Sequence, residues 1–309
     1  MGPFGRAPVT LLLLGSLLAA VLSGCSRDDP NGPGARTVTL GVGSTDEQRM
    51  LAALTVVALR DAGFSVQTQT ELGGTVALRR EGLRSNIDLW WDYTGAAWAL
   101  GLGEQAPPAD PVESFQRVQR ADEDRGLTWL EPSSANATLA LFVRVGDVPA
   151  EDSPRGLSWL AGVLSRGEER LCADRDFVRR RGGLDAFAEA YAIELGRIRV
   201  MAADEAEAVI GVAEERCFAG LATATSGPAR AAGLAPVADE LAIFPAFIVA
   251  PVVRTAVLAR QPELRAALAP LAGVLDTRAL GELNGEVARG RDPGELAAAF
   301  LAQLAPPEG

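Results

Sequence analysis

The sequence predicts an α/β protein of two lobes arranged as a clamshell, each lobe a mostly parallel β-sheet flanked by helices. From Arg36 onward, short apolar runs alternate with longer amphipathic segments, the pattern of stacked β-α units. Two such series follow each other along the chain. Apolar residues make up 48% of the 309 residues and charged residues 22%, which is typical of a folded chain long enough for two lobes.

The first series opens with an apolar run, TVTLGV at 37–42, which predicts a strand. A helix is expected at 46–62, because Met50, Leu51 and Leu54 recur at helical spacing and Gly63 ends the pattern. The same reasoning predicts strands at 64–72, 87–91, 127–130 and 138–145, and helices at 74–85 and 112–125.

The second series predicts another lobe of the same kind. Strands are expected at 170–173, 197–201 and 218–223, and helices at 157–165, 184–192 and 203–215. Three terminal helices follow at 263–272, 276–288 and 292–304, with Asp276 and Asp292 as N-caps of the last two. We therefore assign residues 36–140 and 245–309 to the first lobe and residues 141–244 to the second.

The N-terminus has the pattern of a secretory signal. Arg6 precedes an apolar run at 9–21 and the small residues Leu22-Ser23-Gly24, and this run is shorter than the ~20 residues that a membrane-spanning helix needs. Leu22-Ser23-Gly24-Cys25 resembles the lipobox of bacterial lipoproteins. The resemblance implies a signal peptide at 1–24, a lipidated Cys25 that anchors the protein to the membrane, and a flexible tether at 25–35. Ordinary secretion with an incidental cysteine is the alternative.

Charge and composition exclude several classes of function. A net charge of −11 argues against nucleic-acid binding. The chain has no histidine and no lysine, so it has no Ser-His-Asp triad, imidazole metal site, Schiff-base lysine or P-loop lysine. No cofactor and no metal are expected. Cys172 and Cys217 form an even pair in an exported chain, which favours a disulfide over two buried free thiols.

Three stretches together point to one family. They are GVGSTDEQ at 41–48, LGGT at 72–75 followed by IDLWWDYTG at 87–95, and FPAF at 244–247 followed by APVVR at 250–254. In this order the sequence resembles the osmoprotectant-type substrate-binding proteins of ABC importers, which serve glycine betaine, choline and related quaternary amines. The resemblance covers about residues 36–304. It implies the type II periplasmic-binding-protein fold, a small solute as ligand, and permease subunits as partners.

The glycine-containing turns suggest how a ligand would be held. Ser44 and Thr45 stand just ahead of one predicted helix and Gly74 and Thr75 begin another, and free backbone N–H groups and hydroxyls at such helix starts favour a carboxylate. The same glycines would also serve as ordinary tight turns in any α/β lobe. A carboxylate is the group that betaines carry, so these turns are candidate binding elements.

Further ligand residues are implied by the family resemblance. Family members hold the quaternary ammonium in a cage of tyrosines. Tyr93 and Phe247 match cage positions, and Arg180 matches a carboxylate donor, although Arg179 and Arg181 beside it equally suggest a solvated surface run. The remaining matched positions are Thr94, Asn136 and Thr138.

The cage is depleted relative to the family. Leu139 and Ile248 replace tyrosines, and ATATSG at 222–227 lacks both the aromatic residue and the aspartate that the family has there. Trp90, Trp91 and Trp98 are expected to pack in the core, the alternative being that they restore aromatic surface near Tyr93.

The sequence therefore predicts an extracytoplasmic solute receptor that performs no chemistry. Because the cage is thin, a different zwitterionic or polar solute is an alternative, as is a degenerate sensor without transport. An enzyme on the same fold would have to use a pair such as Asp92 and Tyr93 for acid-base chemistry.

Overall fold

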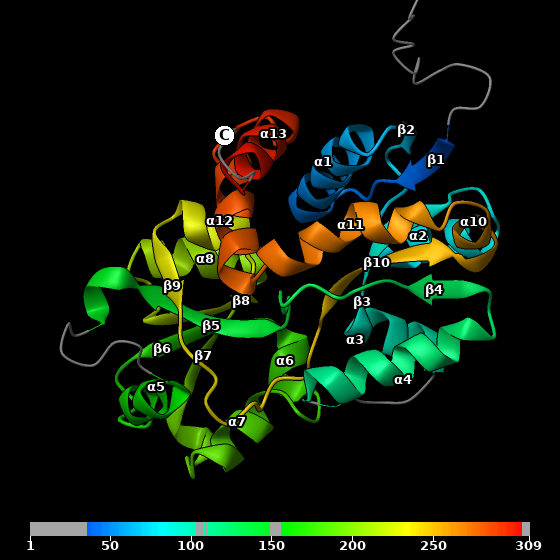
Figure 1. The fold of residues 1–309 in the computed structure, drawn as a ribbon. Coiled ribbons are helices and arrows are strands. Elements are labelled where there is room, and N and C mark those ends of the chain that lie inside the picture. Colours follow the sequence, from blue (N-terminus) through cyan, green and yellow to red (C-terminus); the bar gives the residue numbers. More distant parts are fainter. Residues whose placement is uncertain (1–35, 103–107, 109, 149–155, 305–309) are drawn as a thin grey trace, which may run out of the picture.

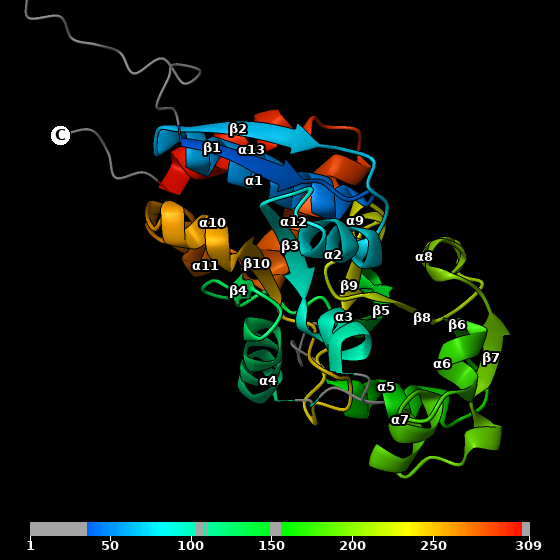
Figure 2. The ribbon, with the colours of Figure 1, turned by 90° about the vertical axis from the view of Figure 1, so that its right-hand side faces the viewer.

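The computed structural model describes residues 36–102, 108, 110–148 and 156–304. The chain forms two lobes, each built on one five-stranded sheet with helices around it (Figure 1). In Figure 2 the second lobe, mostly green, lies below and beside the first. The predicted α/β two-lobed fold is confirmed. The predicted signal peptide, Cys25 and the tether lie outside the described residues.

The first lobe combines the N-terminal part of the described chain with its C-terminal part. Its elements are β1 (Arg36–Gly41), α1 (Asp46–Asp61), β2 (Phe64–Gln69), α2 (Thr75–Leu83), β3 (Leu89–Tyr93), α3 (Thr94–Ala97), the π-helix η1 (Trp98–Leu102), α4 (Pro111–Glu123), β4 (Leu127–Trp129), β10 (Val249–Arg254), α10 (Thr255–Arg260), α11 (Glu263–Val274), α12 (Thr277–Ala288) and α13 (Pro293–Leu304). The strand order is β2-β1-β3-β10-β4.

The second lobe is formed by the middle of the chain. Its elements are β5 (Leu139–Arg144), the 3₁₀ helix η2 (Val145–Asp147), α5 (Leu157–Leu164), β6 (Arg170–Ala173), α6 (Arg175–Arg179), α7 (Leu184–Ala190), the 3₁₀ helix η4 (Leu195–Arg197), β7 (Arg199–Ala202), α8 (Glu205–Ala213), β8 (Ala219–Thr223), α9 (Gly227–Ala231) and β9 (Leu234–Pro236). The strand order is β7-β6-β8-β5-β9.

Each sheet contains one reversed strand. Strand β10 is antiparallel to both β3 and β4, and β5 is antiparallel to both β8 and β9, whereas β1 is parallel to β2 and β3 and β6 is parallel to β7 and β8. The reversed strand is in each case the first one formed after the chain crosses from the other lobe. Because β5 begins at Leu139, Leu139 and Ala140 belong to the second sheet and not to the first lobe, where the sequence placed them.

The two crossing segments are tied to each other. Asn136 Oδ1 accepts a hydrogen bond from Phe247 N at 2.8 Å, and Thr138 Oγ1 donates one to Pro245 O at 2.6 Å. Thr94 adds to this junction, since its hydroxyl accepts from Ile248 N at 3.0 Å. These bonds join the outgoing and returning chains at the point about which the lobes would move relative to each other.

A buried charge network fixes one face of the first sheet. Arg79 on α2 forms ion pairs with Asp92 on β3, at 3.1 Å, and with Asp122 on α4, and all three side chains are nearly inaccessible. Trp90 Nε1 donates to Asp92 Oδ2 at 3.2 Å, and Trp129 Nε1 to Asp122 Oδ2 at 2.8 Å. Burial raises the pKa of Asp92 to about 6, against the lowering effect of the Arg79 guanidinium.

This network explains an error in the predicted strand boundary. The sequence placed the third strand at 87–91, but the observed strand continues through Asp92 to Tyr93. A charged residue usually marks a strand end, whereas Asp92 is retained inside because Arg79 and Trp90 satisfy its carboxylate. Trp90, Trp91 and Trp98 are all buried in the core, as the sequence predicted.

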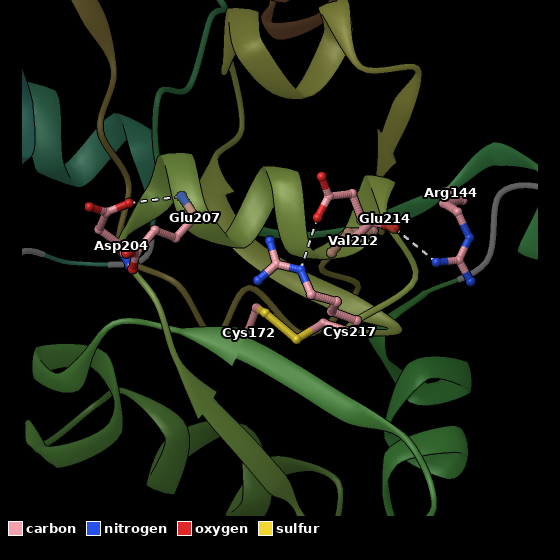
Figure 3. Close-up of a disulfide and its surroundings, with 8 residues drawn as sticks. Arg144, Cys172, Asp204, Glu207, Val212, Glu214 and Cys217 are labelled. Carbon is pink, nitrogen blue, oxygen red and sulfur yellow. Dashed lines mark hydrogen bonds and ion pairs between the residues drawn. A yellow bond between two sulfur atoms is a disulfide. The ribbon is translucent and has the colours of Figure 1, made fainter.

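A disulfide joins Cys172 on β6 to Cys217, which follows α8 (Figure 3). The two Cα atoms are 5.8 Å apart, and both residues lie in a small apolar cluster of the second lobe. The adjacent α8 carries Gly211, where a Cβ would stand 2.8 Å from Cys172 Sγ. Glycine at this position therefore lets the helix pack directly on the bridge.

Candidate functional site

A cavity of about 420 Å³ lies between the two lobes. Its described lining comes from the turn before α1, the starts of α1 and α2, the end of β3, the turn between β8 and α9, and single residues of other elements. The lining residues are Thr45, Asp46, Glu47, Gln48, Thr75, Tyr93, Ala137 and Asn284 from the first lobe and its crossing segment, and Glu205, Thr223, Thr225, Ser226, Gly227 and Pro228 from the second.

Glu47 is the central group of the first-lobe wall. It lies in the first turn of α1, which begins at this point because Thr45 and Gln48 form a capping box. Glu47 Oε1 accepts a hydrogen bond from the Tyr93 hydroxyl at 2.6 Å, and Glu47 Oε2 accepts one from Asn284 Nδ2 at 2.8 Å. The carboxylate thus links α1, β3 and α12.

The environment of Glu47 and Tyr93 shifts the acidity of both. Burial raises the pKa of Glu47, while hydrogen bonds from Tyr93 and Asn284 oppose that rise. Burial, reinforced by the nearby Glu47 and Asp92 carboxylates, raises the pKa of Tyr93 well above its ordinary value. Tyr93 is therefore a neutral phenol that donates a hydrogen bond to Glu47, and it is one of the residues that line the cavity.

Glu205 is the corresponding acid of the second-lobe wall. It occupies the first position of α8 and accepts hydrogen bonds from the Thr223 hydroxyl at 2.9 Å and the Ser226 hydroxyl at 2.7 Å. Ser226 also caps α9 by accepting from Ala229 N. Glu205 therefore holds the turn from β8 to α9 in the shape that forms the cavity wall.

The lobes also meet next to the cavity, where α9 packs against α12. Asn284 Nδ2 donates to Thr225 O at 2.9 Å across this contact. A Cβ at Gly227 would stand 2.4 Å from Asn284 O, so glycine permits the close approach of the two helices. The cavity is thus bordered on one side by a direct contact between the lobes.

The match with known proteins extends over most of the chain. Residues 36–303 match the family described as the substrate-binding domain of ABC-type glycine betaine transport systems. The chain belongs to this family. Its members are extracytoplasmic receptors that bind a small solute and work with an ABC transporter, and they are not a class of enzymes.

Individual relatives also align with this chain over most of its length. The chain is 30% identical over 279 residues to the glycine-betaine-binding protein of Pseudomonas aeruginosa, covering 86% of this chain and 88% of that protein. It is 29% identical over 278 residues to the glycine betaine-binding protein YehZ of Escherichia coli, covering 87% and 91%. The solved structure of apo YehZ superposes with a TM-score of 0.77 at 29% identity and covers 86% of this chain and 99% of that one.

Three of the ten ligand residues expected from the sequence line the cavity of this family member, namely Thr45, Thr75 and Tyr93. Ser44 and Gly74 stand one residue before Thr45 and Thr75 in the same two turns. The N–H groups of the α1 turn are partly taken by its own cap, since Gln48 N donates to Thr45 Oγ1 at 3.1 Å.

The other five expected residues lie elsewhere. Asn136 and Thr138 bond the two crossing segments to each other, and Thr94, at the start of α3, bonds the returning segment at Ile248. Phe247 packs over Gly95, where a Cβ would stand 2.3 Å from the ring. Arg180 is exposed at the C-terminal end of α6 and is absent from the described cavity lining.

Several cavity-lining residues were not expected from the sequence, and the polar groups among them include Glu47, Glu205, Thr225 and Asn284. A signal was available for two of them, because Glu205 follows the N-cap Asp204 and Thr225 follows a strand, and both places adjoin the carboxyl edge of a parallel sheet. Asn284 had a weaker signal, a polar residue on the buried stripe of α12 next to Leu283 and Gly285.

Neither a metal site nor a membrane-spanning helix is found among the described residues. They contain no group of three or more Cys, Asp or Glu side chains placed to hold a metal ion. Within the same ranges, no helix has the length and apolar character needed to cross a membrane.

Proposed function

We propose that this protein binds a quaternary amine of the osmoprotectant type, such as glycine betaine or choline, between its lobes and delivers it to the permease of an ABC importer. The observation that carries the proposal is the cavity between the lobes, which is lined by Tyr93 and by the Glu47 carboxylate to which the Tyr93 hydroxyl donates. An aromatic face and a carboxylate both attract a cation that has lost its hydration. The names of the Pseudomonas and Escherichia relatives support the same ligand class.

Closure follows from where the cavity walls originate. The first lobe provides Glu47 and Tyr93, and the second provides Glu205, so a ligand that touches both walls binds more tightly when the lobes are closed. Permease recognition of the closed form would complete delivery. Lipidated Cys25 would hold the receptor at the membrane. More than one acyl chain is needed for this, because a single chain gives only marginal membrane binding.

The chain offers a matched pair of variants for the test, because it contains two tyrosines. Tyr93→Leu removes the ring from the cavity, whereas Tyr191→Leu removes a ring from the second lobe, where it packs on Phe187. Isothermal titration with glycine betaine and choline should show saturable binding to the unaltered protein. A cation-π contact of about 0.5–2 kcal/mol predicts about 2- to 30-fold weaker binding for Tyr93→Leu and unchanged affinity for Tyr191→Leu.

Two results would contradict the proposal. Equal loss of affinity in both tyrosine variants would show that the effect is not local to the cavity. An absence of binding for every quaternary amine tried, in a protein whose thermal unfolding is cooperative, would favour another polar solute or a sensor that does not transport. For the anchor, Cys25→Ala should move the protein from the membrane fraction to the soluble fraction.

A further inference from the structure

The charged side chains that line the cavity are all acidic. The described lining contains Asp46, Glu47 and Glu205 and includes no arginine. Asp46 is neutralised by an ion pair with Arg49. Glu47 and Glu205 form no ion pair with an arginine of the described residues, and their hydrogen bonds come from neutral groups. An uncompensated carboxylate therefore faces the cavity from each lobe.

A second, independent feature of the cavity is an unused hydrogen-bond acceptor. Asn284 is 2% exposed and lines the cavity, and its Oδ1 has no hydrogen-bond partner among the described residues. The orientation of this amide is fixed, because Nδ2 donates both to Glu47 Oε2 at 2.8 Å and to Thr225 O at 2.9 Å. A buried acceptor without a partner is costly, so a ligand that brings a donor would gain from it.

The described cavity lining offers no cation to a carboxylate. Arg180, the expected carboxylate donor, is exposed at the C-terminal end of α6 and is not part of the described cavity lining. The first turns of α1 and α9 are capped by Thr45 and Ser226, whereas α2, whose Thr75 lines the cavity, begins without a side-chain cap and offers a carboxylate backbone N–H groups alone. A carboxylate entering the cavity would therefore meet two acidic side chains and no opposing cation of the described lining.

We propose that the cavity selects an organic cation that carries a hydrogen-bond donor and no carboxylate. This inference rests on the proposed function and narrows its ligand class. The positive head would lie between the Tyr93 ring and the Glu47 and Glu205 carboxylates, and a hydroxyl or N–H group of the ligand would donate to Asn284 Oδ1. Choline has both features, glycine betaine has a carboxylate in place of the donor, and tetramethylammonium has neither donor nor carboxylate.

The test compares these three probes by isothermal titration on the full chain in a nonionic detergent. Choline should bind at least about tenfold more tightly than glycine betaine, the equivalent of one lost charge-assisted contact. Choline should also bind more tightly than tetramethylammonium, because only choline supplies the donor.

Two charge variants make the test specific. Glu47→Gln keeps the size of the side chain and removes its charge. It should weaken choline binding by about tenfold or more and glycine betaine binding by less, so that the preference for choline over glycine betaine falls. Glu282→Gln removes an equal charge from the exposed face of α12, outside the described cavity lining, and should leave the preference unchanged.

Each of the other possible results refutes a specific part of this inference. Glycine betaine binding as tightly as choline, or an equal loss for both ligands in Glu47→Gln, refutes the selectivity and leaves the proposed function standing. Tetramethylammonium binding as tightly as choline refutes the role of the Asn284 acceptor. Failure of all three probes to bind refutes both this inference and the proposed function.

Discussion

Replacing Arg79 by methionine should destabilise the first lobe strongly. The change leaves Asp92 and Asp122 buried, with side chains that are 0% and 1% exposed, while removing the cation that both share. Removal of one partner from a buried ion pair costs about 3–5 kcal/mol. We expect the lower part of this range, because Trp90 still donates to Asp92 and Trp129 and Arg125 still donate to Asp122.

Urea unfolding followed by tryptophan fluorescence measures the loss of stability in the lobe that contains Arg79, since four of the five tryptophans lie in that first lobe. With a slope of about 2 kcal/mol per molar urea, a loss of about 3 kcal/mol lowers the midpoint by about 1.5 M. Arg80→Met is the matched control, because the neighbouring Arg80 is 55% exposed and pairs only at the surface. Its midpoint should stay close to that of the unaltered protein.

The pH dependence of the difference tests the mechanism. Burial already raises the pKa of Asp92 to about 6, and the loss of Arg79 removes the effect that opposes this rise. A carboxyl whose pKa is raised by folding binds more protons in the native state, so its contribution to stability improves as the pH falls. The stability gap between Arg79→Met and Arg80→Met should therefore narrow from about pH 7 to about pH 5. Equal midpoints at neutral pH, or a gap that widens on acidification, would refute the reasoning.

Two further predictions concern the disulfide and the cavity. Replacing Cys172 and Cys217 by alanine removes a bridge between residues 45 positions apart. The chain-entropy relation predicts a loss of about 4 kcal/mol in the free energy of unfolding, which the fluorescence of Trp159 in the second lobe should report during urea unfolding. An unchanged midpoint would show that the bridge constrains the unfolded chain little. Burial raises the pKa of Glu47. The affinity for choline should therefore be full above that raised pKa and should fall below it, where protons neutralise the carboxylate. Binding titrations between about pH 8 and about pH 4 should show this fall in the unaltered protein and a flatter profile in Glu47→Gln.

Most of the fold could be predicted from the sequence because it depends on local signals. Alternating apolar runs and amphipathic segments mark strands and helices, and capping residues such as Asp276 mark where helices begin. The misplaced end of β3 shows the limit of such signals. Asp92 is compatible with a strand interior only because Arg79, on another element, pairs with it, and that partner cannot be identified from a strand pattern.

The candidate site was harder to predict for the same reason. Thr45, Thr75 and Tyr93 stand at turns and strand ends, which the sequence marks locally, and they do line the cavity. The bond between Glu47 and Asn284 joins residues 237 positions apart, so neither residue has a local signal of its partner. Acidic residues are also common in the first turn of a helix because they interact favourably with the helix dipole. A functional residue such as Glu47 therefore cannot be distinguished there from the sequence.

The positions of Thr94, Asn136 and Thr138 separate two roles that a motif match does not distinguish. All three match the family pattern, yet Asn136 and Thr138 bond one crossing segment to the other, and Thr94 bonds the returning segment to the start of α3. A receptor that closes on its ligand needs a junction of defined geometry as much as it needs binding groups. Family positions can therefore be retained for the junction while the residues that touch the solute change, and a thin aromatic cage in this chain is compatible with an intact closing mechanism. The acidic cavity walls then become the features that decide which solute the closed form prefers.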